Sequence, residues 1–272
     1  MNRRVSRLSI GLLALLLPLA ACGDDKAYTA SSASSSSSAA SSSSTAPQVS
    51  GSVTVFAAAS LTESFNDEKT ALGTAQPGLS ITYSFAGSGA LVTQVQQGAP
   101  ADVIATADTA SMKKLTDAGL VETPTTFAHN KLEILVAPGN PKGIKTLADL
   151  ARTDIIFVTE DVSVPAGKYT AQILTAAGVT ANPKSKEPDV KSAVAKVTSG
   201  EADATIVYVT DVKAAGAKGT GVEIPDGQNV IADYPIAIVK ATKNHDAAAA
   251  FVADIVSGHG QQALASHGFL PA

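Results

Sequence analysis

Residues 53–63 read Val-Thr-Val-Phe-Ala-Ala-Ala-Ser-Leu-Thr-Glu, and this stretch decides the fold. Its β-branched and aromatic start at 53–56 predicts a buried strand, and a helical pattern follows at 61–71. Ser60 stands at the junction, and Glu63 three residues later completes the pattern of a helix capping box. Ligands of open α/β sheets bind beyond the carboxyl ends of strands, so Ser60 is either a plain helix cap or part of a binding site.

The same alternation of short and long apolar segments continues to the C-terminus and predicts an α/β protein. We expect strands at 53–56, 80–85, 102–105, 132–137, 155–158, 204–208, 222–224 and 236–239. We expect helices at 61–71, 90–97, 110–118, 147–150, 167–177, 190–199, 247–255 and 260–267.

Two largely apolar segments, 132–137 and 234–239, predict places where the chain crosses between two lobes. A self-contained block of expected strands and helices separates them. We therefore expect a first lobe at 52–133 plus 235–272 and a second lobe at 134–234, with a ligand cleft between the lobes.

Residues 1–21 predict a signal peptide, because basic side chains precede a short apolar run at 8–21. The basic residues are Arg3, Arg4 and Arg7. The run ends in Leu-Ala-Ala-Cys at 19–22, which resembles the lipobox of bacterial lipoproteins. That resemblance implies cleavage before Cys22 and lipidation of its thiol. The alternative is an ordinary secretory signal with a chance cysteine.

Cys22 is the only cysteine, so the exported domain contains no disulfide bond and depends on its core for stability. Residues 22–51 are rich in serine and alanine, a composition that predicts a flexible tether. We expect an extracytoplasmic domain anchored to the cell membrane through Cys22.

The charge balance excludes some classes of partner. The chain has a formal net charge of −4, and removal of the signal peptide takes away three arginines and no acid. An acidic chain without a basic run is a poor binder of nucleic acid. If the ligand is an anion, local dipoles rather than long-range attraction must bind it.

Ser88 marks a second junction, after the expected strand 80–85. Gly87 and Gly89 flank it and allow the backbone to come close to a ligand. The segment has no lysine followed by serine or threonine, so it is not a phosphate-binding P-loop.

Two further helix starts and one strand end have the same character. Pro165 is usual at the first position of a helix and leaves the Ala166 amide free. Asp189 is a natural N-cap, so the amide of Val190 lacks a helical acceptor. Tyr208 ends an apolar strand, where its hydroxyl belongs either to the core edge or to the cleft.

Together these segments resemble the periplasmic molybdate-binding proteins of ABC transporters, the ModA family. The matching segments are Ala57-Ala58-Ala59-Ser60-Leu61, Phe85-Ala86-Gly87-Ser88, Gly98-Ala99-Pro100-Ala101-Asp102-Val103, Val164-Pro165-Ala166-Gly167-Lys168-Tyr169, Ile206-Val207-Tyr208 and Gly268-Phe269. The resemblance runs from about Val53 to the C-terminus. It implies a type II periplasmic-binding-protein fold, in which each lobe is a mixed sheet flanked by helices.

The resemblance also implies the ligand contacts. They are the hydroxyls and amides of Ser60 and Ser88, the amides of Ala166 and Val190, and the hydroxyl of Tyr208. The commoner second motif of the family is richer in serine. The two glycines around Ser88 therefore imply a looser loop, which makes Ser88 the weaker assignment of the two serines.

Residues of this kind suit a fully deprotonated oxyanion. Molybdate presents only acceptors, whereas hydrogenphosphate carries a proton that needs an acceptor such as Asp or Glu. None of the five expected contacts is acidic. Tungstate is not distinguished from molybdate, and sulfate, thiosulfate or another small anion remains the alternative ligand.

The expected function is capture of the anion by lobe closure, which a membrane permease then recognises. We expect a monomer that is not an enzyme and needs no cofactor. A serine hydrolase would need a base near Ser60 or Ser88. The histidines are His129, His245, His259 and His267, and none stands at an expected strand end. A metal site is likewise poorly supported, because the chain has no cysteine pair and no H-E-x-x-H motif.

Overall fold

The computed structural model describes residues 48–272. The predicted signal peptide at 1–21, the predicted lipidation of Cys22 and most of the predicted tether at 22–51 lie outside the described residues. Within residues 48–272, no helix has both the length and the apolar character needed to cross a membrane.

The first lobe is built on parallel strands that each lead into a helix. The strands are β1 (Gly51–Ala58), β2 (Leu79–Ala86) and β3 (Val103–Ala105), with β1 between the other two. The helices are η1 (Ala59–Leu61, a 3-10 turn), α1 (Thr62–Ala75), α2 (Ser88–Gln96), α3 (Thr109–Asp117), α7 (His245–Ser257) and α8 (His259–His267). Because the strands are parallel, their carboxyl ends share one edge of the sheet, where η1 and α2 begin.

Alternation along β1 divides the buried side chains of this lobe between two faces of the sheet. Val53, Val55 and Ala57 belong to one buried cluster, whereas Phe56 packs with Leu91 in a second cluster under α2 and α3. Helices therefore cover both faces, as the period-2 pattern of a fully buried strand requires.

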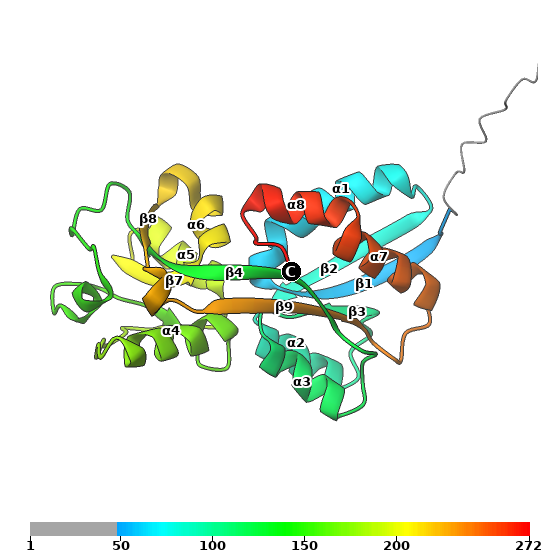
Figure 1. Ribbon diagram of the computed structural model, residues 1–272, viewed down its shortest axis with the longest axis horizontal. Coiled ribbons are helices and arrows are strands. Elements are labelled where there is room, and N and C mark those ends of the chain that lie inside the picture. The colour runs from blue at the N-terminus through cyan, green and yellow to red at the C-terminus, as the bar shows by residue number, and fades with distance from the viewer. Residues whose placement is uncertain (1–47) are drawn as a thin grey trace, which may run out of the picture. The chain divides into compact units, whose positions relative to one another are not determined.

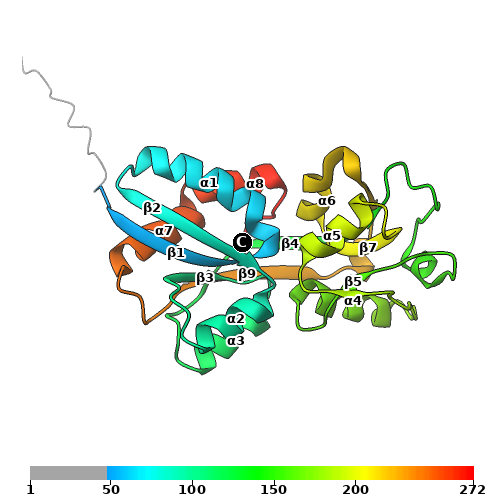
Figure 2. The same ribbon diagram turned by 180° about the vertical axis from the view of Figure 1, so that it is seen from behind.

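Two long strands connect the lobes, as Figures 1 and 2 show. The first half of β4 (Thr125–Val136) pairs antiparallel with β9 (Ile231–Ile238), and its second half pairs with two strands of the second lobe. The path through the sheet is β2-β1-β3-β9-β4-β7, with β8 on β4. The predicted lobe limits, 133/134 and 234/235, fall inside these two strands, and a division at those residues stays a prediction.

The second lobe carries the remaining elements. Its strands are β5 (Thr159–Glu160), β6 (Lys186–Glu187), β7 (Ala204–Tyr208) and β8 (Thr220–Glu223). Its helices are η2 (Leu147–Ala151), α4 (Pro165–Ala176), α5 (Val190–Thr198), α6 (Val209–Ala215), η3 (Gly216–Lys218) and η4 (Asp226–Gln228). The mixed sheet with helices on its faces confirms the predicted α/β class.

Some predicted elements are wrong in place or kind. The strand expected at 155–158 is a loop with a single bridge from Phe157 to Ala204. The side chain of Asp203 accepts the Ile156 amide at 2.7 Å, which takes that donor from a strand ladder. The helix expected at 147–150 is the 3-10 helix η2, and the sequence pattern missed α6, β6 and the first half of β4.

Candidate functional site

A small cavity lies where the two lobes meet, and the five predicted contact residues all line it. They are Ser60, Ser88, Ala166, Val190 and Tyr208. The empty space between the lining atoms, including its opening to solvent, is about 200 Å³, of which about 10 Å³ accepts the centre of a water-sized sphere. The rest of the lining is Ala58, Ala59, Ala86, Gly87, Ala107, Val164, Pro165 and Asp189. Of these residues, only Ala107 was not named in the sequence analysis, because it lies in none of the matching segments.

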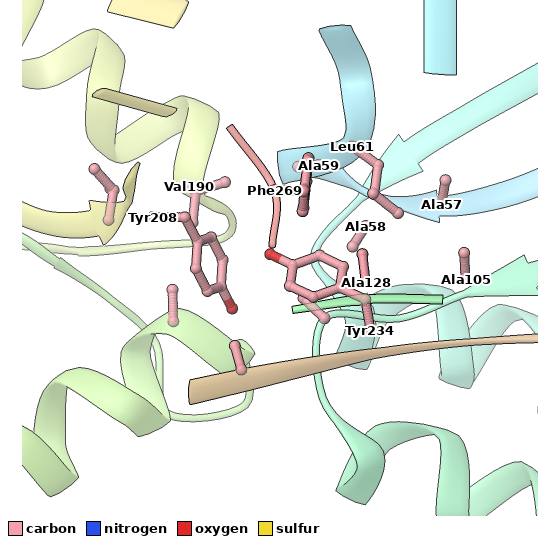
Figure 3. Packing of buried hydrophobic residues seen from close by; sticks show 14 of the residues in the cluster. Ala57, Ala58, Ala59, Leu61, Ala105, Ala128, Val190, Tyr208, Tyr234 and Phe269 are labelled. Atoms are coloured by element: carbon pink, nitrogen blue, oxygen red, sulfur yellow. The ribbon is translucent and has the colours of Figure 1, made fainter. Parts of the chain in front are cut away.

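Both lobes contribute to the lining (Figure 3). Tyr208 and Val190 come from the second lobe, and Ala58 and Ala59 face them from the first. A ligand in the cavity therefore contacts both lobes at once.

Three α-helices begin at the cavity. α2 starts at Ser88, α4 starts at Pro165 just before Ala166, and α5 starts at Val190. Amides in the first turn of a helix have no acceptor within that helix, and the dipole places positive charge there. As predicted, Asp189 is the N-cap of α5: its carboxylate accepts the Ser192 amide at 2.9 Å.

The hydroxyl of Ser88 is held by a donor behind it. The amide of Ala107 donates to Ser88 Oγ over 3.1 Å, and Ser88 is 1% exposed. Because an amide can only donate, the proton of this hydroxyl remains free for an acceptor in the cavity.

Ser60 is not a helix cap, which was one of the two alternatives that the sequence left open. Ser60 lies inside the 3-10 turn η1, and α1 has Leu61 as its N-cap without a side-chain cap. Instead, Ser60 Oγ lies 2.9 Å from the hydroxyl of Tyr234 on β9. Glu63 does not complete a capping box either, because its carboxylate accepts from Lys191 of the second lobe at 2.6 Å.

Tyr208 supplies an unused donor. It is 1% exposed at the end of β7, and its hydroxyl makes no hydrogen bond of normal geometry among the described residues, although the hydroxyl of Tyr234 lies beside it. Burial raises the pKa of Tyr208 well above its ordinary value, so the hydroxyl keeps its proton. A buried hydroxyl without a partner costs free energy, which a bound acceptor would recover.

The two glycines beside Ser88 allow the lobes to approach. A Cβ atom on Gly87 would lie 2.5 Å from the carbonyl oxygen of Pro188, and one on Gly89 would lie 2.7 Å from that of Ser163. Both carbonyls belong to the second lobe. The sequence suggested that these glycines loosen the loop around Ser88. In the structure they instead allow close contact between this loop and the opposite lobe.

Ion pairs cross between the lobes beside the cavity. Lys191 Nζ lies 2.6 Å from Glu63 Oε2 of the first lobe and 3.0 Å from Asp211 Oδ1 of its own lobe. Burial acts to lower the pKa of Lys191, but the two carboxylates outweigh it and raise that pKa. Lys168 pairs with Asp108 across the cleft at 3.3 Å. Positive charge therefore offsets Glu63, Asp211 and Asp108, whereas Asp189 in the lining accepts a backbone amide instead.

Glu160 is a further acid close to the site. It is fully buried at the end of β5, and neither carboxyl oxygen has a partner among residues 48–272. Burial, with the nearby carboxylates of Asp211, Asp189 and Glu187, raises the pKa of Glu160 to about 8. Near neutral pH this side chain is therefore mostly uncharged.

Comparison with known proteins first defines the class. The chain belongs to the family of bacterial extracellular solute-binding proteins, which matches residues 53–270. Within it, the molybdate-binding protein ModA of Mycobacterium tuberculosis strain H37Rv is 40% identical over 265 residues, covering 96% of this chain and 97% of the relative. The chain is thus a member of the ModA family, as its motifs predicted.

Solved structures confirm the fold. The periplasmic molybdate-binding protein of Azotobacter vinelandii covers 81% of this chain with a TM-score of 0.70 at 21% identity. The sulfate-binding protein SubI of M. tuberculosis covers the same share with a TM-score of 0.68 at 22% identity. Because both share the periplasmic-binding-protein fold, the fold alone does not select the anion.

Gly87→Ala and Gly89→Ala should each weaken ligand binding more than they lower stability. The added methyl groups meet backbone of the opposite lobe, so the closed arrangement costs roughly 1–3 kcal/mol more, or about 5- to 150-fold in affinity. Calorimetric titration with molybdate measures the loss, and thermal melting without ligand measures stability. Gly73→Ala is the control, since nothing lies within 4 Å of its Cβ position. Unchanged affinity in both cleft variants would show that these contacts are not needed for binding.

Glu160→Gln should flatten the dependence of stability on pH. The pKa of Glu160 rises from 4.5 to about 8 on folding, so the folded protein retains a proton that the unfolded chain releases in this range. The stabilising contribution of Glu160 is therefore complete below pH 4.5, falls by roughly 1.4 kcal/mol per pH unit as the pH rises, and is lost above the folded pKa. Urea unfolding from pH 5 to 9 measures this slope.

Asp246→Asn, at a fully exposed position, is the control for that series. It should keep the wild-type shape of the curve. A Glu160→Gln curve that is parallel to the wild-type curve would contradict the pKa assigned to Glu160.

Proposed function

We propose that this chain is an extracytoplasmic solute-binding lipoprotein that captures molybdate, or tungstate, for an ABC importer. Its two lobes close around the fully deprotonated anion, and Ser60, Ser88, Ala166, Val190 and Tyr208 donate hydrogen bonds to it. The membrane permease recognises the closed form.

The observation that carries this proposal is the hydroxyl of Tyr208. It is a buried donor that borders the cavity and lacks a partner among the described residues. Together with the free proton of Ser88 and the helix-start amides, it makes a lining that donates from both lobes. A ligand that only accepts hydrogen bonds fits these donors, and the one carboxylate in the lining, Asp189, already accepts the Ser192 amide at 2.9 Å.

Helix dipoles supply the positive charge that the lining lacks in side chains. Each of α2, α4 and α5 contributes roughly half an elementary charge at its N-terminus. Their sum approaches the two charges of molybdate. Hydrogen bonds to a charged acceptor contribute about 1.5–3 kcal/mol each. Several such bonds exceed the roughly 8 kcal/mol that micromolar binding requires.

The choice of anion rests on family membership. Sulfate is also a dianion without a proton, and it would accept the same hydrogen bonds. The 40% identity to a relative named as a molybdate-binding protein, over nearly the whole chain, favours molybdate over sulfate. Sulfate or thiosulfate remains the alternative ligand.

Membrane attachment and the absence of catalysis complete the proposal. The lipobox-like residues 19–22 support anchoring through Cys22, and the domain acts as a monomer. No histidine is among the residues that line the cavity. In the described part of the chain, histidines lie beside carboxylates instead, such as His259 with Asp254 and His267 with Asp67. The serines therefore act as hydrogen-bond donors.

Tyr208→Phe should weaken molybdate binding roughly 10- to 100-fold, because one charge-assisted hydrogen bond is lost. Stability without ligand should stay the same or rise, since an unpartnered buried hydroxyl is removed. Calorimetric titration of residues 48–272 with molybdate, tungstate, sulfate and phosphate measures the affinities. The wild-type domain should bind molybdate and tungstate more tightly than sulfate, and phosphate weakly.

Tyr83→Phe is the matched control, because its hydroxyl donates to Glu68 at 2.6 Å and does not line the cavity. It should leave the affinities unchanged. Equal affinity of the wild type for sulfate and molybdate would overturn the choice of anion, and wild-type affinity in Tyr208→Phe would overturn the role of Tyr208.

A further inference from the structure

Tyr234 lies directly behind Ser60 and outside the lining of the cavity. Its hydroxyl oxygen is 2.9 Å from Ser60 Oγ, and Tyr234 and Ser60 are 0% and 3% exposed. Tyr234 therefore lies behind the lining, where its hydroxyl meets that of Ser60 at hydrogen-bond distance and also has Asn130 and Tyr208 as polar neighbours.

The position of Tyr234 is fixed by the fold. It pairs with Ala128 in the ladder between β4 and β9, the strands that join the lobes. Its ring packs edge-on against Phe269, with centroids 5.2 Å apart, and against Tyr208 at 5.7 Å. Figure 3 shows the rings of Tyr208 and Tyr234 close to each other. The Gly268-Phe269 segment near the C-terminus thus supports the ring of Tyr234.

The direction of the hydrogen bond follows from the ligand. A hydroxyl has one proton and two acceptor lone pairs. If Ser60 directs its proton at an anion, it has none left for Tyr234, so Tyr234 must donate to Ser60. Ser88 provides the precedent within the same site, because the Ala107 amide donates to its oxygen and leaves its proton free.

We propose that Tyr234 is a positioning residue that donates to Ser60 Oγ and so aims the serine proton into the cavity. This inference rests on the proposed function, since it assigns Ser60 a ligand that only accepts. Ser60 and Ser88 then work alike, each held from behind by a donor. The donor to Ser88 is a backbone amide, whereas the donor to Ser60 is the side chain of Tyr234. A substitution at Tyr234 can therefore remove the hydrogen bond to Ser60.

The test is a double-mutant cycle in calorimetric titrations with molybdate. Tyr234→Phe keeps the ring contacts and should weaken binding roughly fivefold, the effect of one neutral hydrogen bond. Ser60→Ala should weaken binding roughly 10- to 100-fold. Because Tyr234 acts through Ser60, Tyr234→Phe should change the affinity of the Ser60→Ala protein by less than about twofold.

A purely structural role gives a different pattern. It predicts the same factor for Tyr234→Phe with and without Ser60, and that result overturns the inference, as does wild-type affinity in Tyr234→Phe. Melting of each unliganded variant measures stability separately, and Tyr83→Phe again serves as the control. If the wild-type domain binds none of molybdate, tungstate and sulfate, the proposed function falls together with the role of Tyr234. If the wild-type domain binds molybdate and the effects of the two substitutions on affinity are additive, only the role of Tyr234 is wrong.

Discussion

The structure depends on one constraint, which is that a doubly charged anion must leave water for a cavity lined without cationic side chains. Transfer of an ion to a low-dielectric interior costs several kcal/mol even after relaxation. Donors must therefore point at the anion from every side, and negative charge nearby must be suppressed. Three acids around the site meet the second condition: Asp211 is paired with Lys191, Asp108 with Lys168, and Glu160 retains its proton near neutral pH. Asp189, which lines the cavity, accepts the Ser192 amide as the N-cap of α5.

The need for donors on all sides explains the division into lobes. A single sheet edge brings helix starts to one side of a ligand only, whereas two lobes joined by β4 and β9 surround it. Small residues line much of the cavity, so that backbone amides can border it. Gly87 and Gly89 serve the contact between the lobes in the same way, because a larger side chain at either position would meet the backbone of the opposite lobe.

Local signals in the sequence predicted most of the fold and named five residues that line one cavity. A strand followed by a hydroxyl or small residue and then a helix start can be recognised within about ten residues, and four such junctions meet at one cavity with the strand end at Tyr208. Asp189 and Pro165 were predicted correctly for the same reason, since caps and first-turn prolines are local features.

Long-range partners could not be predicted in this way. The capping box of Ser60 and Glu63 is a sound local pattern, yet both side chains bond to residues more than a hundred positions away, Tyr234 and Lys191. The strand expected at 155–158 failed because Asp203 accepts the Ile156 amide. Local sequence patterns contain no information about such long-range pairs. The hydrogen bond between Ser60 and Tyr234 can therefore be found only in the folded structure.

The measurement that tests this account most directly is a crystal structure of the domain grown with molybdate, with molybdenum located by its anomalous scattering. The account predicts one strong peak inside the cavity, with anion oxygens within hydrogen-bond distance of the hydroxyls of Ser60, Ser88 and Tyr208 and of the amides of Ala166 and Val190. A peak elsewhere, or an anion held by a lysine or arginine side chain, would contradict it.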